Sequence, residues 1–140
     1  MYELLQKLHS WWAYLAIIIL LIAVVNAFIG YSGKKNFESK DLRISLFALI
    51  FTHIQLLLGL AVYFVSPLGF SALGEMKNAA LRLTSLEHPL INIIAIVLIT
   101  IGWSKHKKAE GTAKFRKILF FYGVGLLLIL SRIPWSNWLG

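Results

Sequence analysis

Residues 13–29 read AYLAIIILLIAVVNAFI, a stretch that contains no charged side chain and a single amide, Asn26. Three further apolar stretches follow, each bounded by charged or turn-forming residues. About 20 consecutive apolar residues suffice for a helix to cross the hydrocarbon core of a bilayer. The whole chain is 59% hydrophobic, above the roughly 45–50% typical of soluble domains. The sequence therefore predicts an all-α integral membrane protein.

The expected architecture is a single domain of residues 1–140 with four transmembrane helices. Continuous apolar runs indicate helices, because the strands of a membrane barrel are shorter and alternate polar with apolar residues. Short loops after the first and third spans favour antiparallel neighbours, and hence an up-down-up-down four-helix bundle. The expected spans are residues 4–29, 42–65, 81–103 and 118–133.

Basic residues set the expected orientation. Most of them lie in the first and third loops, which the positive-inside rule places in the cytoplasm. Both termini are then periplasmic, in a multi-pass protein of a bacterial inner membrane. The net charge of +8 is thereby assigned to topology and the lipid surface, with no nucleic-acid partner. The two loops contain Lys34, Lys35, Lys40, Arg43, Lys105, Lys107, Lys108, Lys114, Arg116 and Lys117.

Three histidines, His9, His53 and His88, lie inside or at the edge of the apolar spans, whereas His106 falls in a basic loop and is assigned to solvent. An imidazole in hydrocarbon is costly without a partner, so each of the three is a candidate functional residue. The chain has no cysteine, which excludes thiolate metal sites and covalent haem attachment. We therefore expect a haem or another metal held by histidine alone.

Depth in the membrane restricts how these histidines pair. With a rise of about 1.5 Å per residue, His53 lies ~15 Å from the cytoplasmic end of its span, His88 ~22 Å and His9 ~30 Å. Two axial ligands must approach one iron from opposite sides, so His53 and His9 are not expected to share a haem. His88 belongs to both workable pairs. The deeper position of His53 slightly favours the pair His53–His88 over the pair His9–His88.

Each histidine also has an interpretation without a metal. His53 would then be hydrogen-bonded across helices to Asn92 or Tyr122. His9 would be an ordinary interfacial residue, and His88 would lie where the proline that follows it bends the third helix. Three membrane histidines cannot hold two haems by two histidines each, so the expected maximum is one haem per chain.

Two arginines near the periplasmic end are further candidates for haem binding. Arg82 and Arg132 are expected close to the level of His88. Haem carries two propionates, and guanidinium groups bind carboxylates in a bidentate manner. The alternatives are that the two side chains extend to the membrane interface or pair with Glu87.

Four short segments carry a resemblance to a known family. They are HSWW at residues 9–12, FTHIQLLLG at 51–59, EHP at 87–89 and IPW at 133–135. Together they resemble a family of small four-span membrane proteins from Bacteroidetes-type bacteria labelled cytochrome b, over nearly the whole chain. More distantly, the second segment is similar to haem-binding helices of bacterial b-type cytochromes and of haem A synthase. The resemblance implies a bis-histidine haem b and electron transfer within the membrane, with quinones as partners.

The leading expectation is thus a membrane-embedded haem b cytochrome that carries electrons. If the protein is an enzyme, it is expected to be a quinone-linked membrane oxidoreductase. One alternative is a cofactor-free accessory or assembly subunit of a larger membrane complex. The expected protein partners are further copies of this chain or the other subunits of a larger respiratory complex. Another is a copper or zinc site built on His9, His88 and Glu87.

Overall fold

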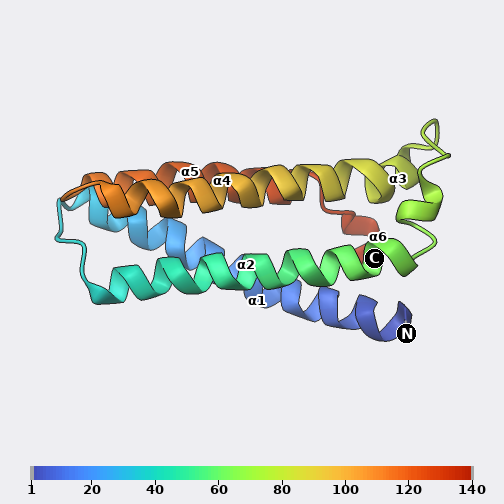
Figure 1. Ribbon diagram of the computed structural model, residues 1–140, viewed down its shortest axis with the longest axis horizontal. Coiled ribbons are helices and arrows are strands. Elements are labelled where there is room, and N and C mark those ends of the chain that lie inside the picture. Colours follow the sequence, from blue (N-terminus) through green and yellow to red (C-terminus); the bar gives the residue numbers. More distant parts are fainter. Residues whose placement is uncertain (1, 140) are drawn as a thin grey trace.

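The computed structural model describes residues 2–139, which form helices joined by short connections (Figure 1). Three helices are long and apolar enough to span a membrane: α1, α2 and the continuous helix Ala79–Lys108. The fourth long helix, α5, has only 19 residues and begins with a basic segment. The elements are α1 (Tyr2–Ser32), α2 (Ser39–Val65), η1 (Phe70–Ala72), α3 (Ala79–Arg82), η2 (Leu83–Glu87), α4 (His88–Lys108), α5 (Ala113–Ser131) and α6 (Trp135–Leu139).

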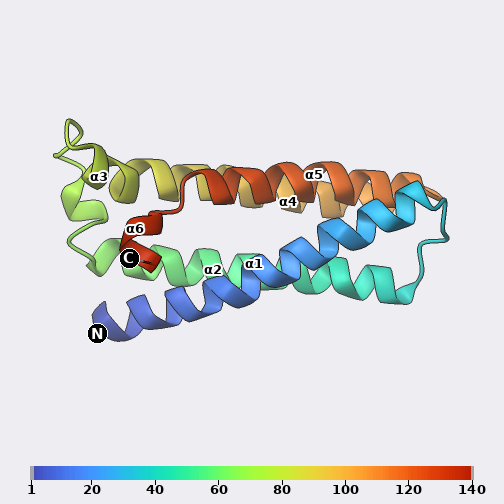
Figure 2. The same cartoon turned by 180° about the vertical axis from the view of Figure 1, so that it is seen from behind.

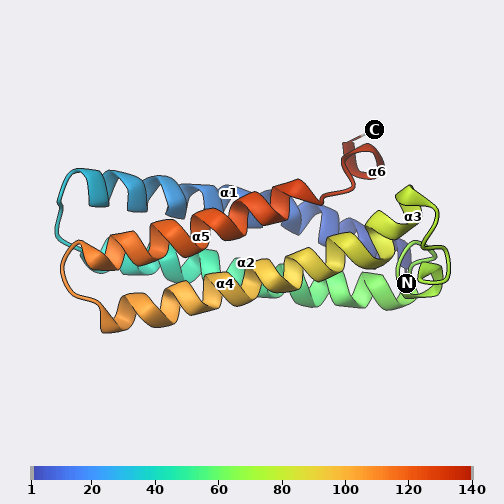
Figure 3. The same cartoon turned by 90° about the horizontal axis from the view of Figure 1, so that it is seen from above.

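The four long helices form an antiparallel bundle. α1 packs mainly against α2 and α5, and α4 packs against α5 and α2, so α1 and α4 are diagonal to each other (Figure 3). The connections 33–38 and 109–112 lie at one end, whereas the termini and the segment 66–78 lie at the other (Figures 1 and 2). α1 crosses the bundle obliquely, lying against α5 near the 33–38 connection and diverging from it towards the N-terminus (Figure 2). The polar ends of the helices are thus gathered at the two ends of the bundle.

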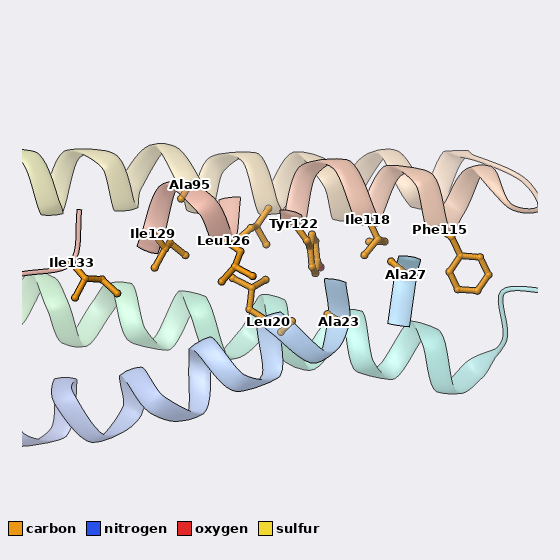
Figure 4. Packing of buried hydrophobic residues seen from close by; sticks show 12 residues of the cluster. Leu20, Ala23, Ala27, Ala95, Phe115, Ile118, Tyr122, Leu126, Ile129 and Ile133 are labelled. Atoms are coloured by element: carbon orange, nitrogen blue, oxygen red, sulfur yellow. The ribbon is translucent and has the colours of Figure 1, made fainter. Parts of the chain in front are cut away.

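Small side chains allow the helices to approach closely in the core. Ala23 and Ala27 of α1 are buried beside Ile118 and Tyr122 of α5 (Figure 4). The Tyr122 hydroxyl donates a hydrogen bond to the main-chain oxygen of Ser45, at 2.8 Å. Without a hydrophobic drive between helices in lipid, such close packing and interhelical hydrogen bonds hold a bundle together.

Large apolar side chains cover much of the outside of the bundle. Leu57 and Leu127, for example, are 67% and 68% exposed. A surface made largely of such exposed apolar side chains would be unfavourable in water. A hydrocarbon environment accepts this surface, which agrees with a protein whose outer face contacts lipid.

The third expected span contains a proline, and the structure shows how the helix accommodates it. A proline removes one N–H and crowds the carbonyl four residues earlier, here that of Ser85. The backbone widens into the π-helical turn η2, in which His88 donates its N–H to the oxygen of Leu83. The freed oxygen of Ser85 accepts a hydrogen bond from the Tyr63 hydroxyl at 2.9 Å. The helix therefore passes through Pro89 without a break.

The assignment of His106 to solvent is wrong. α4 continues to Lys108, beyond the expected end at residue 103, so His106 occupies a helix face that packs on its neighbours. Its side chain is 1% exposed and lies between the rings of Phe37 and Trp103, with centroid distances of 5.3 and 4.6 Å. The basic residues next to it in the sequence are exposed, so the sequence pattern does not show that this face of the helix is buried.

Candidate functional site

A cavity of about 360 Å³ lies at the end of the bundle that holds both termini. Its walls come from α1, α2, the 66–69 segment, the continuous helix 79–108, the end of α5 and α6. Most of the lining is aliphatic or aromatic, with a few polar groups among them. Pockets of a few hundred Å³ with this composition are typical of cofactor and ligand sites. The polar members of the wall include Gln6, His9, Ser10, Thr52, Gln55, Tyr63, His88 and Asn92.

His9 and His88 approach each other in this cavity from the diagonal helices α1 and α4. Their ring centroids are 6.3 Å apart and the ring planes differ by 66°. Metal–imidazole bonds are about 2 Å long, so two imidazoles on opposite sides of one metal have ring centroids ~6 Å apart. The observed separation matches that value.

The orientation of the His88 ring is set by the end of α5. Its Nδ1 lies 3.0 Å from the main-chain oxygen of Arg132. A carbonyl oxygen only accepts, so this contact is a hydrogen bond in the tautomer with the proton on Nδ1, which leaves the lone pair on Nε2. Metal-binding histidines commonly use this arrangement, in which the non-binding nitrogen donates to a carbonyl. The amide nitrogen of Asn92 also lies 3.1 Å from Nδ1. Asn92 adds a second contact by donating its amide N–H to the oxygen of His88 at 2.6 Å.

His9 is held by residues of α2. The Gln55 amide donates from Nε2 to the main-chain oxygen of His9 at 2.9 Å. Nδ1 of His9 and Oε1 of Gln55 are both buried and have no hydrogen-bond partner among the residues that the structure describes. Gly59, one turn further along α2, lies directly against the ring, because a Cβ atom there would be 3.0 Å from Cε1 of His9.

His53 lies outside this cavity wall. Its Nδ1 is 2.7 Å from the oxygen of Leu49, one turn earlier, and its Nε2 is 3.3 Å from Oγ1 of Thr100 on α4. Both ring nitrogens are therefore engaged by protein groups. The interhelical partner is Thr100, not Asn92 or Tyr122.

Arg82, Arg132 and Glu87 form a charged cluster beside His88. Nε of Arg82 lies 2.7 Å from Oε2 of Glu87, and Nε of Arg132 lies 3.7 Å from Oε1. The side chains are 40%, 49% and 31% exposed in the order Arg82, Arg132, Glu87. Neither arginine contributes to the cavity wall as described. Two guanidinium groups against one carboxylate leave this rim with an excess of positive charge.

A site of three protein ligands for copper or zinc is not assembled in the part of the chain that the structure describes. In particular, Glu87 is engaged by the two arginines rather than placed with the histidines. The two imidazoles of His9 and His88 thus line the cavity without a carboxylate ligand from residues 2–139 beside them.

Sequence reasoning missed two groups that position the histidines. Gln55 and Gly59 are four residues apart on an apolar helix, so their common face was a usable signal. The main-chain oxygen of Arg132 leaves no signal in a sequence, because every residue has a carbonyl group.

No protein-family model, curated protein or solved structure matches this chain. The paired histidines and the cavity around them therefore carry the functional proposal.

Proposed function

We propose that this chain is a membrane-embedded b-type cytochrome in which His9 and His88 hold one haem b non-covalently. The single observation that carries the proposal is the 6.3 Å separation of the two rings across a cavity of about 360 Å³. The segments HSWW and EHP, which contain these two residues, belong to the resemblance to small four-span cytochrome b proteins. That resemblance supports the proposal from the side of the sequence.

The geometry favours His9–His88 over the pair His53–His88 that depth counting preferred. His53 already has a partner at each ring nitrogen, and it lies outside the cavity wall. His9, by contrast, has a buried nitrogen without a partner and faces His88 directly.

A haem in this position supplies one-electron chemistry, and ligation by two imidazoles favours electron transfer over oxygen activation. His9 and His88 would hold the group, and an apolar part of the wall that includes Leu20, Ile96 and Ile129 would surround it. Arg82 and Arg132 supply positive charge at the rim for the propionates. The cluster with Glu87 holds these guanidinium groups near His88 before any ligand arrives.

The cellular setting is part of the proposal. α5 is taken as the fourth span, because it packs against α4 and α1 and is apolar beyond its basic first turns. Both termini and the cavity are then periplasmic, in a bacterial inner membrane. The electron donor or acceptor is a quinone dissolved in the same bilayer, whose apolar body can reach the site from lipid.

The visible spectrum of the purified protein tests this proposal. The chain is produced with haem supply, purified in detergent, and measured in its oxidised and dithionite-reduced forms, with extracted haem and bound copper and zinc quantified in parallel. The expected result is one haem b per chain with sharp reduced α and β bands. A colourless protein that also fails to take up added haemin overturns the cytochrome and supports a cofactor-free subunit. Stoichiometric copper or zinc in place of haem overturns it in favour of a metal site.

A further inference from the structure

The environment of His9 contains an incomplete hydrogen-bond pair. Nδ1 of His9 and Oε1 of Gln55 are both buried and unpartnered among the described residues, although α1 and α2 lie side by side there (Figure 1). One of these atoms is a potential donor and the other an acceptor. Buried polar groups are normally paired, so these two complementary atoms on neighbouring helices are candidates for a hydrogen bond with each other.

The Gln55 side chain is already fixed next to residue 9. Its Nε2 donates to the main-chain oxygen of His9 at 2.9 Å. Because that oxygen only accepts, the amide cannot turn over without losing this bond. Oε1 is therefore held within a few ångströms of residue 9, as an acceptor in a wall that is otherwise apolar.

Gly59 contributes by its lack of a side chain. A Cβ atom at this position would lie 3.0 Å from Cε1, 3.5 Å from Nδ1 and 3.7 Å from Nε2 of the His9 ring. The ring thus rests on the backbone of α2, with Gln55 one turn before it. The Gln55–Gly59 turn forms a seat for the imidazole, which limits how the ring can rotate.

We propose that Gln55 is the positioning residue for His9: its Oε1 accepts the Nδ1 proton of the ring, so that Nε2 is presented to the cavity. This inference rests on the proposed function in so far as it takes haem as the group that His9 binds. The arrangement would match His88, whose Nδ1 faces the oxygen of Arg132. Both rings would then be oriented by an acceptor on the nitrogen that does not face the ligand, which also makes each ring a stronger electron donor.

The test compares Gln55→Met with Gln55→Glu. Both variants keep the length of the side chain and lose the Nε2 donor to the His9 oxygen. They differ in the acceptor, which Gln55→Met removes and Gln55→Glu strengthens. Thr100→Val is the control, since it removes a hydroxyl from the same bundle beside His53. A stronger acceptor favours the oxidised iron, so the midpoint potential of the haem is expected to rise in Gln55→Met and fall in Gln55→Glu. Haem is expected to dissociate about 10- to 100-fold faster from Gln55→Met.

Shifts of the same sign in both Gln55 variants, or none beyond that of Thr100→Val, overturn the positioning role. Should Gln55→Glu fail to fold, a rise in Gln55→Met against wild type supports the role, and an unchanged potential overturns it. A purely structural role would lower the yield of haem protein without moving the potential in opposite directions.

A second measurement does not need haem. ¹⁵N spectra of histidine-labelled protein, taken without added haem, report which ring nitrogen of His9 carries the proton. A proton on Nδ1 that is lost or redistributed in Gln55→Met supports the role, and identical spectra in wild type and Gln55→Met overturn it. If wild type takes up no haem but the position of the His9 proton still depends on Gln55, the proposed cytochrome function is overturned. The positioning of His9 by Gln55 is then still supported.

Discussion

Nδ1 of His88 lies 3.0 Å from the main-chain oxygen of Arg132, 44 residues further along the chain. This oxygen is free because α5 ends at Ser131, and the proline at 134 prevents the helix from continuing through residue 133. A helix end thereby orients a ring on a neighbouring helix.

The histidine variants separate the proposed ligands from the other membrane histidine. His9→Ala and His88→Ala are each expected to reduce haem content by more than about 10-fold, because loss of a ligand exceeds the effect of losing its outer partners. His53→Ala is expected to retain haem and to lose about 1 kcal/mol of stability with its hydrogen bonds. Haem-to-protein ratio and thermal unfolding in detergent measure both effects. Haem loss in His53→Ala with retention in His9→Ala would instead restore the pair His53–His88.

Glu87 bridges two partly exposed guanidinium groups, so its contribution to stability is expected to be small. Glu87→Gln should cost at most about 1 kcal/mol, as exposed ion pairs do. The removal of negative charge beside the site should raise the potential of a bound haem. Glu110→Gln, in the opposite loop, serves as the control for the potential. Equal midpoint potentials in wild type and Glu87→Gln would show that the charges of the cluster do not affect the haem.

Gly125 is a close-packing position in the core. A Cβ atom there would lie 2.8 Å from Cγ1 of Ile99 and 3.2 Å from the main-chain oxygen of Ala95. Gly125→Ala is therefore expected to destabilise the bundle by about 1–3 kcal/mol through overpacking. Gly74→Ala is the matched control, because nothing lies within 4 Å of the added atom. Equal melting temperatures for the two variants would show that α4 and α5 separate easily.

His106 is expected to behave as a core residue despite its basic surroundings. His106→Ala should destabilise the protein by about 2 kcal/mol, because it leaves a gap between Phe37 and Trp103. Lys105→Ala, which changes the exposed neighbour, should be nearly neutral. Thermal unfolding of the two variants in the same detergent makes the comparison. A neutral His106→Ala would mean that the side chain is solvated after all.

The orientation can be determined with single cysteines, because the chain contains none of its own. Lys77→Cys lies in the segment 66–78, at the end with the termini, and Glu110→Cys lies in the connection 109–112, at the opposite end (Figure 1). A membrane-impermeant maleimide added to intact spheroplasts is expected to label residue 77 at once and residue 110 only after permeabilisation. The reverse pattern would place both termini in the cytoplasm and overturn the positive-inside assignment.

The sequence by itself determined the class of the protein and nearly all of its helices. Hydropathy and segment length are local properties of the sequence. The apolar stretches, such as residues 13–29, therefore predicted most ends of the four long helices to within a few residues of where the structure has them. The continuation of the third helix through Pro89 followed from the same reasoning, since the distance from residue 89 to residue 103 is too short to cross a bilayer.

Only the tertiary structure decided which residues meet. Depth counting left His88 free to pair with either His9 or His53, and the deeper position of His53 favoured the second pair, whereas the structure places the ring centroids of His9 and His88 6.3 Å apart. The same limit applied to His106, whose burial depends on which face α4 turns towards Phe37. Tilt and rotation of a helix are set by side-chain packing between elements far apart in the chain, and no local pattern of residues records them.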